Sequence, residues 1–342
     1  MKKRIITAIV LTLILAPVIL ISKLIRIFDV IAIVIAIAAS FELVNMYSKE
    51  KPVHLAMKII NAFLTLLLMF SIINYFSNYG DDTIKDPISQ SLMIQFLTFV
   101  KMDQFLTPVV ALLTCFIIIM AIMVINPAYK MADVGKFFIS IIYIGVCVGA
   151  VTILRYLGIR FVVYLLGITV CTDVFALVFG MSFGKHKMAP VTSPKKTWEG
   201  AIGGTAVATV VGICVILFYP HIINGCLKVT DALNISSLFN AERPVDGETF
   251  EFFDKVFRYR EFTIMGKICF AFTLTVFLSV CSQIGDLLAS KLKRTYGIKD
   301  YSNIFPGHGG ILDRFDSLFF ASAVFLLFIL IEMNIFQWPF LA

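Results

Sequence analysis

Two pairs of side chains in the last fifth of the sequence have the types and spacing for metal-assisted chemistry. Asp286 and Ser290 are four residues apart, and Asp313 and Asp316 are three apart. Within a helix each pair would share one face. Carboxylates gathered at one place repel each other unless a cation lies among them, and Mg2+ prefers oxygen ligands that bridge it to phosphates. We therefore predict a magnesium site formed by Asp286, Asp313 and Asp316.

The segment that joins the two pairs is basic and contains several glycines. The run Gly307-His-Gly-Gly310 can adopt conformations closed to other residues and present successive backbone N–H groups to an anion. We predict that this segment binds phosphate through Lys293, Arg294, Lys299, His308, Gly309, Gly310 and Arg314. The alternative is that each acid pairs with Lys293, Arg294 or Arg314 in a network of interfacial salt bridges.

A second polar stretch runs from residue 184 to residue 200. It contains four residues of types that bind phosphate, namely Ser193, Lys195, Lys196 and Thr197. Asp173 lies just upstream within an apolar run, where a carboxylate requires a partner or a water-filled cavity. We expect Asp173 to line the same cavity as the loop. The alternatives are that the lysines only anchor the loop at the membrane surface and that Asp173 forms a structural hydrogen bond.

The composition excludes an ordinary soluble domain. Of the 342 residues, 59% are hydrophobic and 15% charged, against about 45–50% and 25% in soluble proteins. The seven cysteines form no CxxC or Cys/His cluster, which excludes a disulfide framework and a zinc site. The net charge of +7 is carried by short basic clusters beside apolar runs. That pattern favours anionic lipid and nucleotide partners over nucleic acid.

The apolar runs predict the fold class. About 20 apolar residues span a bilayer as a helix, and the sequence has about nine such runs, so we predict an all-α, polytopic transmembrane helix bundle with a polar cavity on the cytoplasmic side. The first run is too long for a secretory signal peptide and is expected to be a span. The predicted spans are 5–21, 27–47, 57–77, 105–126, 136–156, 160–180, 201–219, 265–289 and 313–336.

Along the chain we distinguish three parts. Residues 1–104 hold the first spans and an outer segment, residues 105–200 the middle spans and the Ser-Pro-Lys-Lys loop, and residues 201–342 the expected catalytic spans. The outer segments 78–104 and 220–262 are expected to lie along the membrane surface. In the second, Phe250, Phe253 and Phe257 have amphipathic helical spacing. An ordinary surface loop with incidental aromatics is the alternative.

The distribution of basic residues predicts the orientation. Lys and Arg are concentrated in alternate loops, including those at 184–200 and 290–310. Because cytoplasmic loops carry an excess of basic residues, we place the N-terminus and both polar loops in the cytoplasm. Lys23 and Arg26, between the first two predicted spans, are exceptions to this pattern.

The spacing of the polar residues over the C-terminal segment is specific. It resembles the signature of the phosphatidate cytidylyltransferase family, and here it reads Ser290-x-Leu-Lys293-Arg294-x4-Lys299-Asp300-x-Ser302-x2-Phe-Pro306-x-His308-Gly309-Gly310-x2-Asp313-Arg314-x-Asp316. The loop from Ser193 to Gly200 resembles the family's second common block, and Asp286 resembles one of its metal-ligand aspartates. The segment 220–262 is longer than the connection expected from this resemblance.

The resemblance implies a reaction and its partners. CTP and phosphatidate would give CDP-diacylglycerol and pyrophosphate, with Mg2+ and, in some members, a monovalent cation such as K+. It also implies a homodimer in a bacterial plasma membrane or the endoplasmic reticulum, with the site facing the cytoplasm. The phosphatidate phosphate would attack the α-phosphorus of CTP, so catalysis would consist of positioning and charge neutralisation.

Three other readings remain open. Ser290 would be a nucleophile in a mechanism with a cytidylyl-enzyme, although no base of suitable spacing is evident beside it. A CTP-dependent kinase acting on dolichol or a related lipid alcohol would share the acids, the metal and the basic loops. A transporter would account for many spans and an intramembrane acid, but the sequence lacks the internal repeat typical of that class.

Overall fold

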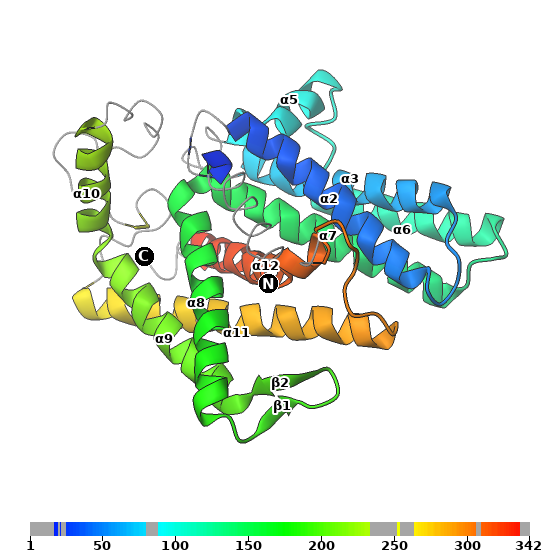
Figure 1. Ribbon diagram of the computed structural model, residues 1–342. Coiled ribbons are helices and arrows are strands. Elements are labelled where there is room, and N and C mark those ends of the chain that lie inside the picture. Colours follow the sequence, from blue (N-terminus) through cyan, green and yellow to red (C-terminus); the bar gives the residue numbers. More distant parts are fainter. Residues whose placement is uncertain are drawn as a thin grey trace. The chain divides into compact units, whose positions relative to one another are not determined.

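The computed structural model of the protein describes residues 17–19, 21, 25–79, 88–232, 252–253, 263–305 and 309–335 (Figure 1). Its contacts divide into two compact units. One is formed mainly by residues 24–156 and 292–315, and the other mainly by residues 157–291 and 316–342. The three parts distinguished in the sequence follow chain order, whereas the two units follow packing.

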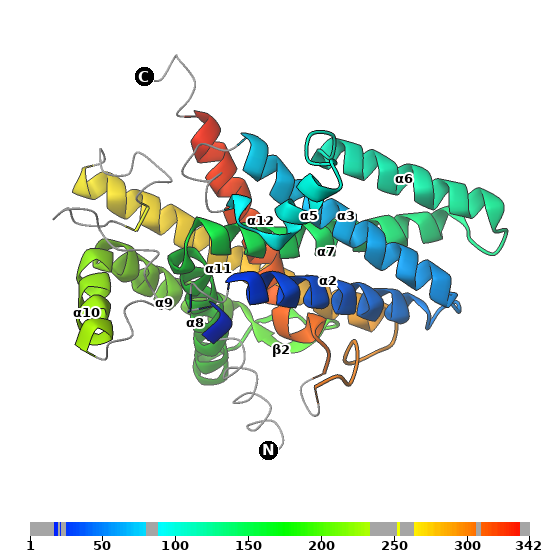
Figure 2. The ribbon, with the colours of Figure 1, turned by 90° about the horizontal axis from the view of Figure 1, so that it is seen from above.

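The first unit contains five helices in full. They are α2 (Ile25–Tyr47), α3 (Leu55–Tyr79), α5 (Leu92–Phe99), α6 (Pro108–Ile125) and α7 (Met131–Leu157). Both ribbon views draw α2 beside α3, and α3 also contacts α6 (Figures 1 and 2). Asn61 of α3 joins three helices, because its side-chain amide donates to Ser40 Oγ of α2 and Ser140 Oγ of α7, each over 2.9 Å.

The second unit contains α8 (Ile159–Phe183), β1 (Lys187–Ala189), β2 (Ser193–Thr197), α9 (Trp198–Leu217) and α10 (Tyr219–Ala232). The two strands pair antiparallel in a short hairpin that joins α8 to α9 (Figure 1). Two further helices, α11 (Ile264–Thr295) and α12 (Leu312–Ile335), begin in one unit and end in the other. These two helices carry the three acids that were predicted to hold Mg2+.

Eight of the described helices are long and apolar enough to cross a membrane. They correspond to the predicted spans from 27–47 onward, so the prediction of a polytopic all-α membrane protein is confirmed. The predicted span 5–21 lies almost entirely outside the described residues. The largest difference in bounds is in α11, which extends six residues beyond the predicted end at 289.

Small residues let the helices of the second unit approach closely. A methyl group at Gly204 of α9 would lie 2.6 Å from the carbonyl oxygen of Thr172 in α8, so only glycine fits there. Gly200 and Gly204 form a Gly-xxx-Gly pattern, which is typical of tightly packed membrane helices. Hydroxyl groups add polar links, for example between Thr172 and Ser279 of α11 over 2.8 Å. These contacts fix α8, α9 and α11 as one packed group.

The segment 220–262 differs from its predicted surface position at residues 252–253. Phe253 is fully buried, and so is Phe252. Their rings lie 5.9 and 5.6 Å, centroid to centroid, from the ring of Phe161 on α8. Phe253 is therefore part of an aromatic core and not of a membrane-surface face. Phe250 and Phe257 lie outside the described residues, and 219–232 form α10.

Candidate active site

The end of α11 positions three predicted site residues on a helix and not in a loop. Lys293 and Arg294 lie in its last turn, where basic side chains interact favourably with the helix dipole. Arg294 Nη1 donates to the carbonyl oxygen of Ile298 over 3.3 Å. Ser290 Oγ approaches Asp286 Oδ1 at 3.5 Å, which confirms that this pair shares a face.

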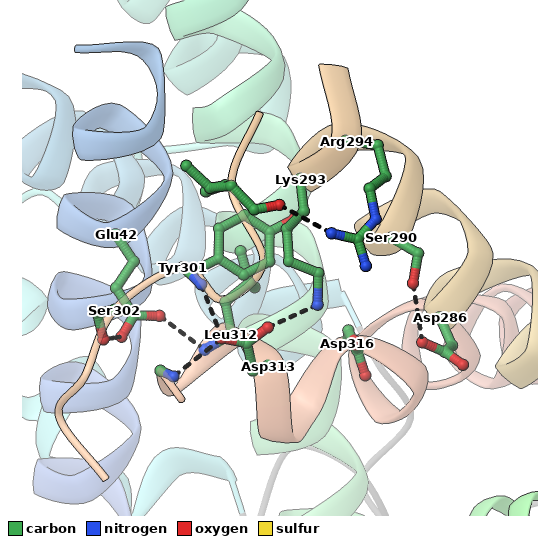
Figure 3. Close-up of polar contacts among 12 residues, drawn as sticks. Glu42, Asp286, Ser290, Lys293, Arg294, Tyr301, Ser302, Leu312, Asp313 and Asp316 are labelled. Carbon is green, nitrogen blue, oxygen red and sulfur yellow. Dashed lines mark hydrogen bonds and ion pairs between the residues drawn. The ribbon is translucent and has the colours of Figure 1, made fainter. Parts of the chain in front are cut away.

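Asp313 is the most highly connected of the predicted acids. Its side chain is only 3% exposed and accepts from Lys293 Nζ over 2.6 Å (Figure 3). Its second oxygen, Oδ2, accepts from the backbone N–H groups of Tyr301 and Gly310 over 2.8 and 2.9 Å. The alternative of a salt bridge between an acid and a neighbouring base is thus realised for Asp313 and Lys293. Asp313 thus holds the loop between α11 and α12 near its middle, at Tyr301, and near its end, at Gly310.

The backbone N–H groups expected to hold phosphate are already used within the protein. The N–H of Gly310 donates to Asp313, and the N–H groups of Ile311 and Leu312 donate to Glu42. The N–H of Gly309 donates to the carbonyl oxygen of Phe305 over 3.1 Å. In this conformation the acceptors are a carbonyl oxygen for Gly309 and a carboxylate oxygen for Gly310. The binding of phosphate by Gly309 and Gly310 stays a prediction.

Gly309 and Gly310 lack side chains, and this allows the carboxylates of Asp313 and Glu42 to come close to the backbone. Gly309 has a φ of +84°, in the region that favours glycine, and a methyl group there would lie 2.7 Å from Asp313 Oδ2. A methyl group at Gly310 would overlap the carboxylate of Glu42. His308 lies outside the described residues.

Glu42 is a site residue that the sequence reasoning missed. It lies on α2, is 2% exposed, and accepts from Ser302 Oγ, Ile311 N and Leu312 N over 2.6, 2.9 and 2.8 Å (Figure 3). The signal that could have identified it is an acid inside an apolar run, since such residues are functional candidates by default. Asp29 in the same helix has that signal too, and it accepts from Ser91 Oγ and the backbone N–H of Leu92 at the start of α5.

Within the second unit, four predicted residues come together. Lys196 of β2 forms an ion pair with Asp286 of α11, and Ser290 lies beside the same carboxylate. Asp173, on an open face of α8, interacts electrostatically with both Asp286 and Lys196. The expectation that Asp173 faces the same polar region as the loop is consistent with this grouping.

Asp316 lies where α11 and α12 touch. A methyl group at Gly285 would lie 2.8 Å from the carbonyl oxygen of Asp316 and from Phe320 Cβ, so the two helices meet at the residue before Asp286. The Asp316 side chain is nearly buried, and its Oδ1 accepts from the backbone N–H of Ser317 over 2.8 Å.

The hairpin separates the residues of the second predicted loop. Lys196 points to Asp286, whereas Lys195 is exposed and Ser193 is half-buried. Thr197 is buried and caps α9, because its hydroxyl accepts from the backbone N–H of Gly200 over 3.2 Å. The observed contact of Thr197 is structural, and its phosphate contact stays a prediction. Of the remaining predicted donors, Lys299 and Arg314 are exposed.

The acids were also predicted to hold Mg2+. Among the described residues, no group of three or more His, Cys, Asp or Glu side chains is placed to hold a metal ion. The donor chemistry nevertheless fits, since carboxylate oxygens are the ligands that Mg2+ prefers. In this conformation a lysine ammonium group lies against Asp286 and another against Asp313. Each lysine neutralises a carboxylate that a cation would otherwise neutralise.

A cavity of about 500 Å³ lies in the first unit beside the anchored loop. Its polar walls are Asn45, Ser48, Lys49, Asp300, Ser302 and Asn303, with Met46, Ile298 and Tyr301 completing the lining. Ser302 also donates to Glu42, and Tyr301 donates to Asp313. This volume lies within the range of about 300–1,000 Å³ that is usual for small-molecule sites.

The fold and these contacts define an integral, multi-pass membrane enzyme whose lysine–aspartate pairs suit phosphate-bearing substrates. The Cytidylyltransferase family model matches residues 2–332, and the chain belongs to that family.

Individual relatives agree with this assignment. The phosphatidate cytidylyltransferase of Bacillus subtilis (strain 168) is 30% identical over 335 residues, which cover 96% of this chain and 97% of the relative. The proteins of the same name from Staphylococcus haemolyticus (strain JCSC1435) and Staphylococcus aureus (strain COL) are 31% and 32% identical over 193 residues. Each of these two matches covers 56% of this chain and 58% of the relative.

Proposed function

We propose that this chain transfers the cytidylyl group of CTP to phosphatidate, giving CDP-diacylglycerol and pyrophosphate. The observation that carries the proposal is the pairing of Lys293 with Asp313 inside the signature segment. Lys196 and Asp286 form a second lysine–aspartate ion pair. The match to a named relative along 96% of the chain supports the same reaction.

In this reaction the lysines change partners. A phosphate oxygen of the lipid attacks the α-phosphorus of CTP, the bond to the β-phosphate oxygen breaks, and pyrophosphate leaves with the electron pair. Ammonium groups stabilise the charge on the nonbridging and leaving oxygens. Lys293 and Lys196 are suited to this because each is already held at an acid and can turn to an incoming phosphate. Arg294, Lys299, Arg314 and His308 supply further positive charge on the signature segment.

Mg2+ is proposed as the cofactor, with Asp286, Asp313 and Asp316 as the residues that would hold it. When bound, it would supply charge neutralisation at the phosphate oxygens. The support is the donor chemistry of the three carboxylates and their helical spacing along α11 and α12. A monovalent cation such as K+ is an additional proposal that rests on the family resemblance alone.

The cavity beside the loop is proposed to take the nucleoside of CTP. Its amide and hydroxyl groups can donate to and accept from a base edge and ribose hydroxyls. Lys49 on its wall adds positive charge at the same place. The walls belong to the segment that holds Asp313, so the nucleoside would bind next to the reacting phosphates.

Orientation and assembly are further proposals. Basic residues in alternate loops support a site that faces the cytoplasm, where CTP is found. The bacterial relatives support the plasma membrane as its location. The homodimer rests on the family resemblance, and the mass of the detergent-solubilised protein by light scattering tests it.

The deciding experiment follows the label of CTP. The purified chain in detergent micelles would be given phosphatidate, Mg2+ and CTP labelled at the α-phosphate. Label is expected in the lipid fraction, and CTP labelled at the γ-phosphate is expected to leave its label in soluble pyrophosphate. Label reaching the lipid from the γ-phosphate, with α-label in soluble CDP, would identify a lipid kinase and overturn the proposal.

A further inference from the structure

Glu42 is a buried carboxylate within an apolar helix. It lies on α2, a membrane-spanning helix, and its side chain is 2% exposed. Among the described residues Glu42 takes part in no ion pair; its partners are one hydroxyl and two backbone N–H groups. An acid in such a position is costly unless those hydrogen bonds stabilise its charge. Its position therefore makes Glu42 a candidate functional residue.

The hydrogen-bond partners of Glu42 include two residues at the start of α12. Ile311 lies directly before α12, and Leu312 is the first residue of that helix. The first N–H groups of a helix have no partner within the helix, and a negative charge at that end interacts favourably with the helix dipole. Glu42 thus acts as a capping anion for α12, although it comes from a helix 269 residues earlier in the sequence.

The same contact explains why residue 310 is glycine. Any side chain there would overlap the carboxylate of Glu42, so the loop can approach α2 only without one. Ser302, the third partner, lies near the middle of the loop. Glu42 therefore holds the loop against α2 at two places, near its middle and at its end, while Asp313 accepts from Tyr301 and Gly310 of the same loop.

We propose that Glu42 is a positioning residue for the cytidylyl transfer. It fixes the start of α12, and with it Asp313, Lys293 and the loop wall of the cavity, through its hydrogen bonds to Ile311, Leu312 and Ser302. This inference rests on the proposed function, because it assigns Glu42 to that reaction. A residue with this role influences the rate without touching the substrate, because small displacements of reacting groups reduce turnover strongly.

A different role for Glu42 would give the opposite result. If its carboxylate only occupied the N–H groups until a substrate phosphate displaced it, removing its charge would ease substrate binding. A positioning role instead requires Glu42 to stay in place during turnover. The two roles are distinguished by the separate effects of a variant on kcat and on KM.

The experiment compares Glu42→Gln with Glu50→Gln in the full chain. Glu50 is a suitable control because its exposed carboxylate pairs with Lys136 of α7 over 2.6 Å, and the chemical change is the same. Glu42→Gln is expected to lower kcat about 10- to 100-fold with KM for both substrates little changed. Glu50→Gln should match the unchanged protein, and Glu42→Asp should fall between the two.

A second measurement does not depend on activity. Hydrogen exchange by mass spectrometry over peptides spanning residues 309–316 should rise in Glu42→Gln, because the amide keeps only one acceptor oxygen and the N–H group of Ile311 or of Leu312 therefore loses its partner. If Glu42→Gln does not fold, Ser302→Ala removes one of the three hydrogen bonds and should give a smaller loss of kcat, about threefold.

Three outcomes would overturn the inference. The first is an unchanged kcat in a folded Glu42→Gln protein, and the second is unchanged hydrogen exchange over residues 309–316. The third is a lower KM with kcat preserved, which would favour the role in which a substrate phosphate displaces the carboxylate of Glu42. Failure of the proposed function is recognised separately, since the unchanged protein would then form no labelled lipid from CTP labelled at the α-phosphate.

Discussion

Lys293 and Asp313 form a nearly buried ion pair, with Nζ and Oδ1 2.6 Å apart and side chains only 12% and 3% exposed. Because Asp313 also accepts hydrogen bonds from two backbone N–H groups, its carboxylate has two functions. It pairs with the charge of Lys293 and it holds the loop. Asp316, one helical turn later, accepts from the neighbouring Ser317. The two acids of the signature therefore differ in structural importance.

Because of this difference, substitutions of Asp313 and Asp316 should have different effects on stability. Asp316→Asn should reduce CTP-dependent lipid formation about 100-fold or more, which is the usual effect of removing one preorganised charge, with little loss of stability. Asp313→Asn should lose activity as well, and its thermal unfolding midpoint should fall, because breaking a buried pair costs about 3–5 kcal/mol. The assay is label transfer combined with unfolding in detergent. Near-normal turnover in Asp316→Asn would contradict the role of that acid.

Two neighbouring lysines of the hairpin give a matched pair. Lys196 pairs with Asp286, while Lys195 is exposed. Lys196→Ala should lower kcat/KM about 10- to 100-fold, since charge-assisted contacts to phosphate are among the strongest hydrogen bonds. Lys195→Ala should change it less than about threefold, as expected of an exposed charge. Equal losses in the two variants would show that both lysines bind substrate.

The difference between these lysines illustrates what the sequence could not supply. Both have the same residue type in the same loop, so composition and motif treat them alike. Residues alternate between the two faces of a strand, and the tertiary contact of β2 with α11 decides which lysine faces Asp286. The spans were predictable, by contrast, because about 20 apolar residues are needed for each crossing. For the same reason their predicted ends lie within a few residues of most observed helices.

The contacts of Glu42 were also not predictable from the sequence, because they join residues that are far apart along the chain. Its partners Ile311 and Leu312 are separated from it by almost the whole chain, and no local pattern connects them. At Gly310 the N–H group that was expected to face phosphate donates to the carboxylate of Asp313. That contact was not predictable from the sequence, because a carboxylate brought by tertiary packing satisfies the same N–H group as a phosphate.

Thr197 provides a test of structural against substrate-binding roles. Its hydroxyl caps α9 and it is buried, so Thr197→Val should destabilise the protein by about 1 kcal/mol, which is typical of losing an N-cap. Thr197→Ser keeps the hydroxyl and should retain most of the stability. In both variants KM for CTP should stay unchanged. A raised KM in Thr197→Val with an unchanged unfolding midpoint would restore the phosphate contact expected from the sequence.

The cavity predicts a selective effect on the nucleotide. Asn303 lies on its wall, and the loss of one hydrogen bond of about 0.5–1.5 kcal/mol should raise KM for CTP in Asn303→Ala about 2- to 10-fold. KM for phosphatidate should not change and serves as the internal control. An effect confined to phosphatidate would assign the cavity to the lipid headgroup.

Removal of divalent cations tests the proposed metal separately from its residues. Chelation by EDTA should abolish lipid labelling, and added Mg2+ should restore it, because carboxylates beside transferred phosphates need a cation to limit repulsion. In this conformation Lys196 and Lys293 neutralise Asp286 and Asp313, so chelation should leave the unfolding midpoint almost unchanged. A loss of stability on chelation would indicate a structural metal, and full activity under thorough chelation would leave the lysines as the only cations at these acids. The second result would contradict a catalytic Mg2+, whereas the first would add a structural role to the catalytic one.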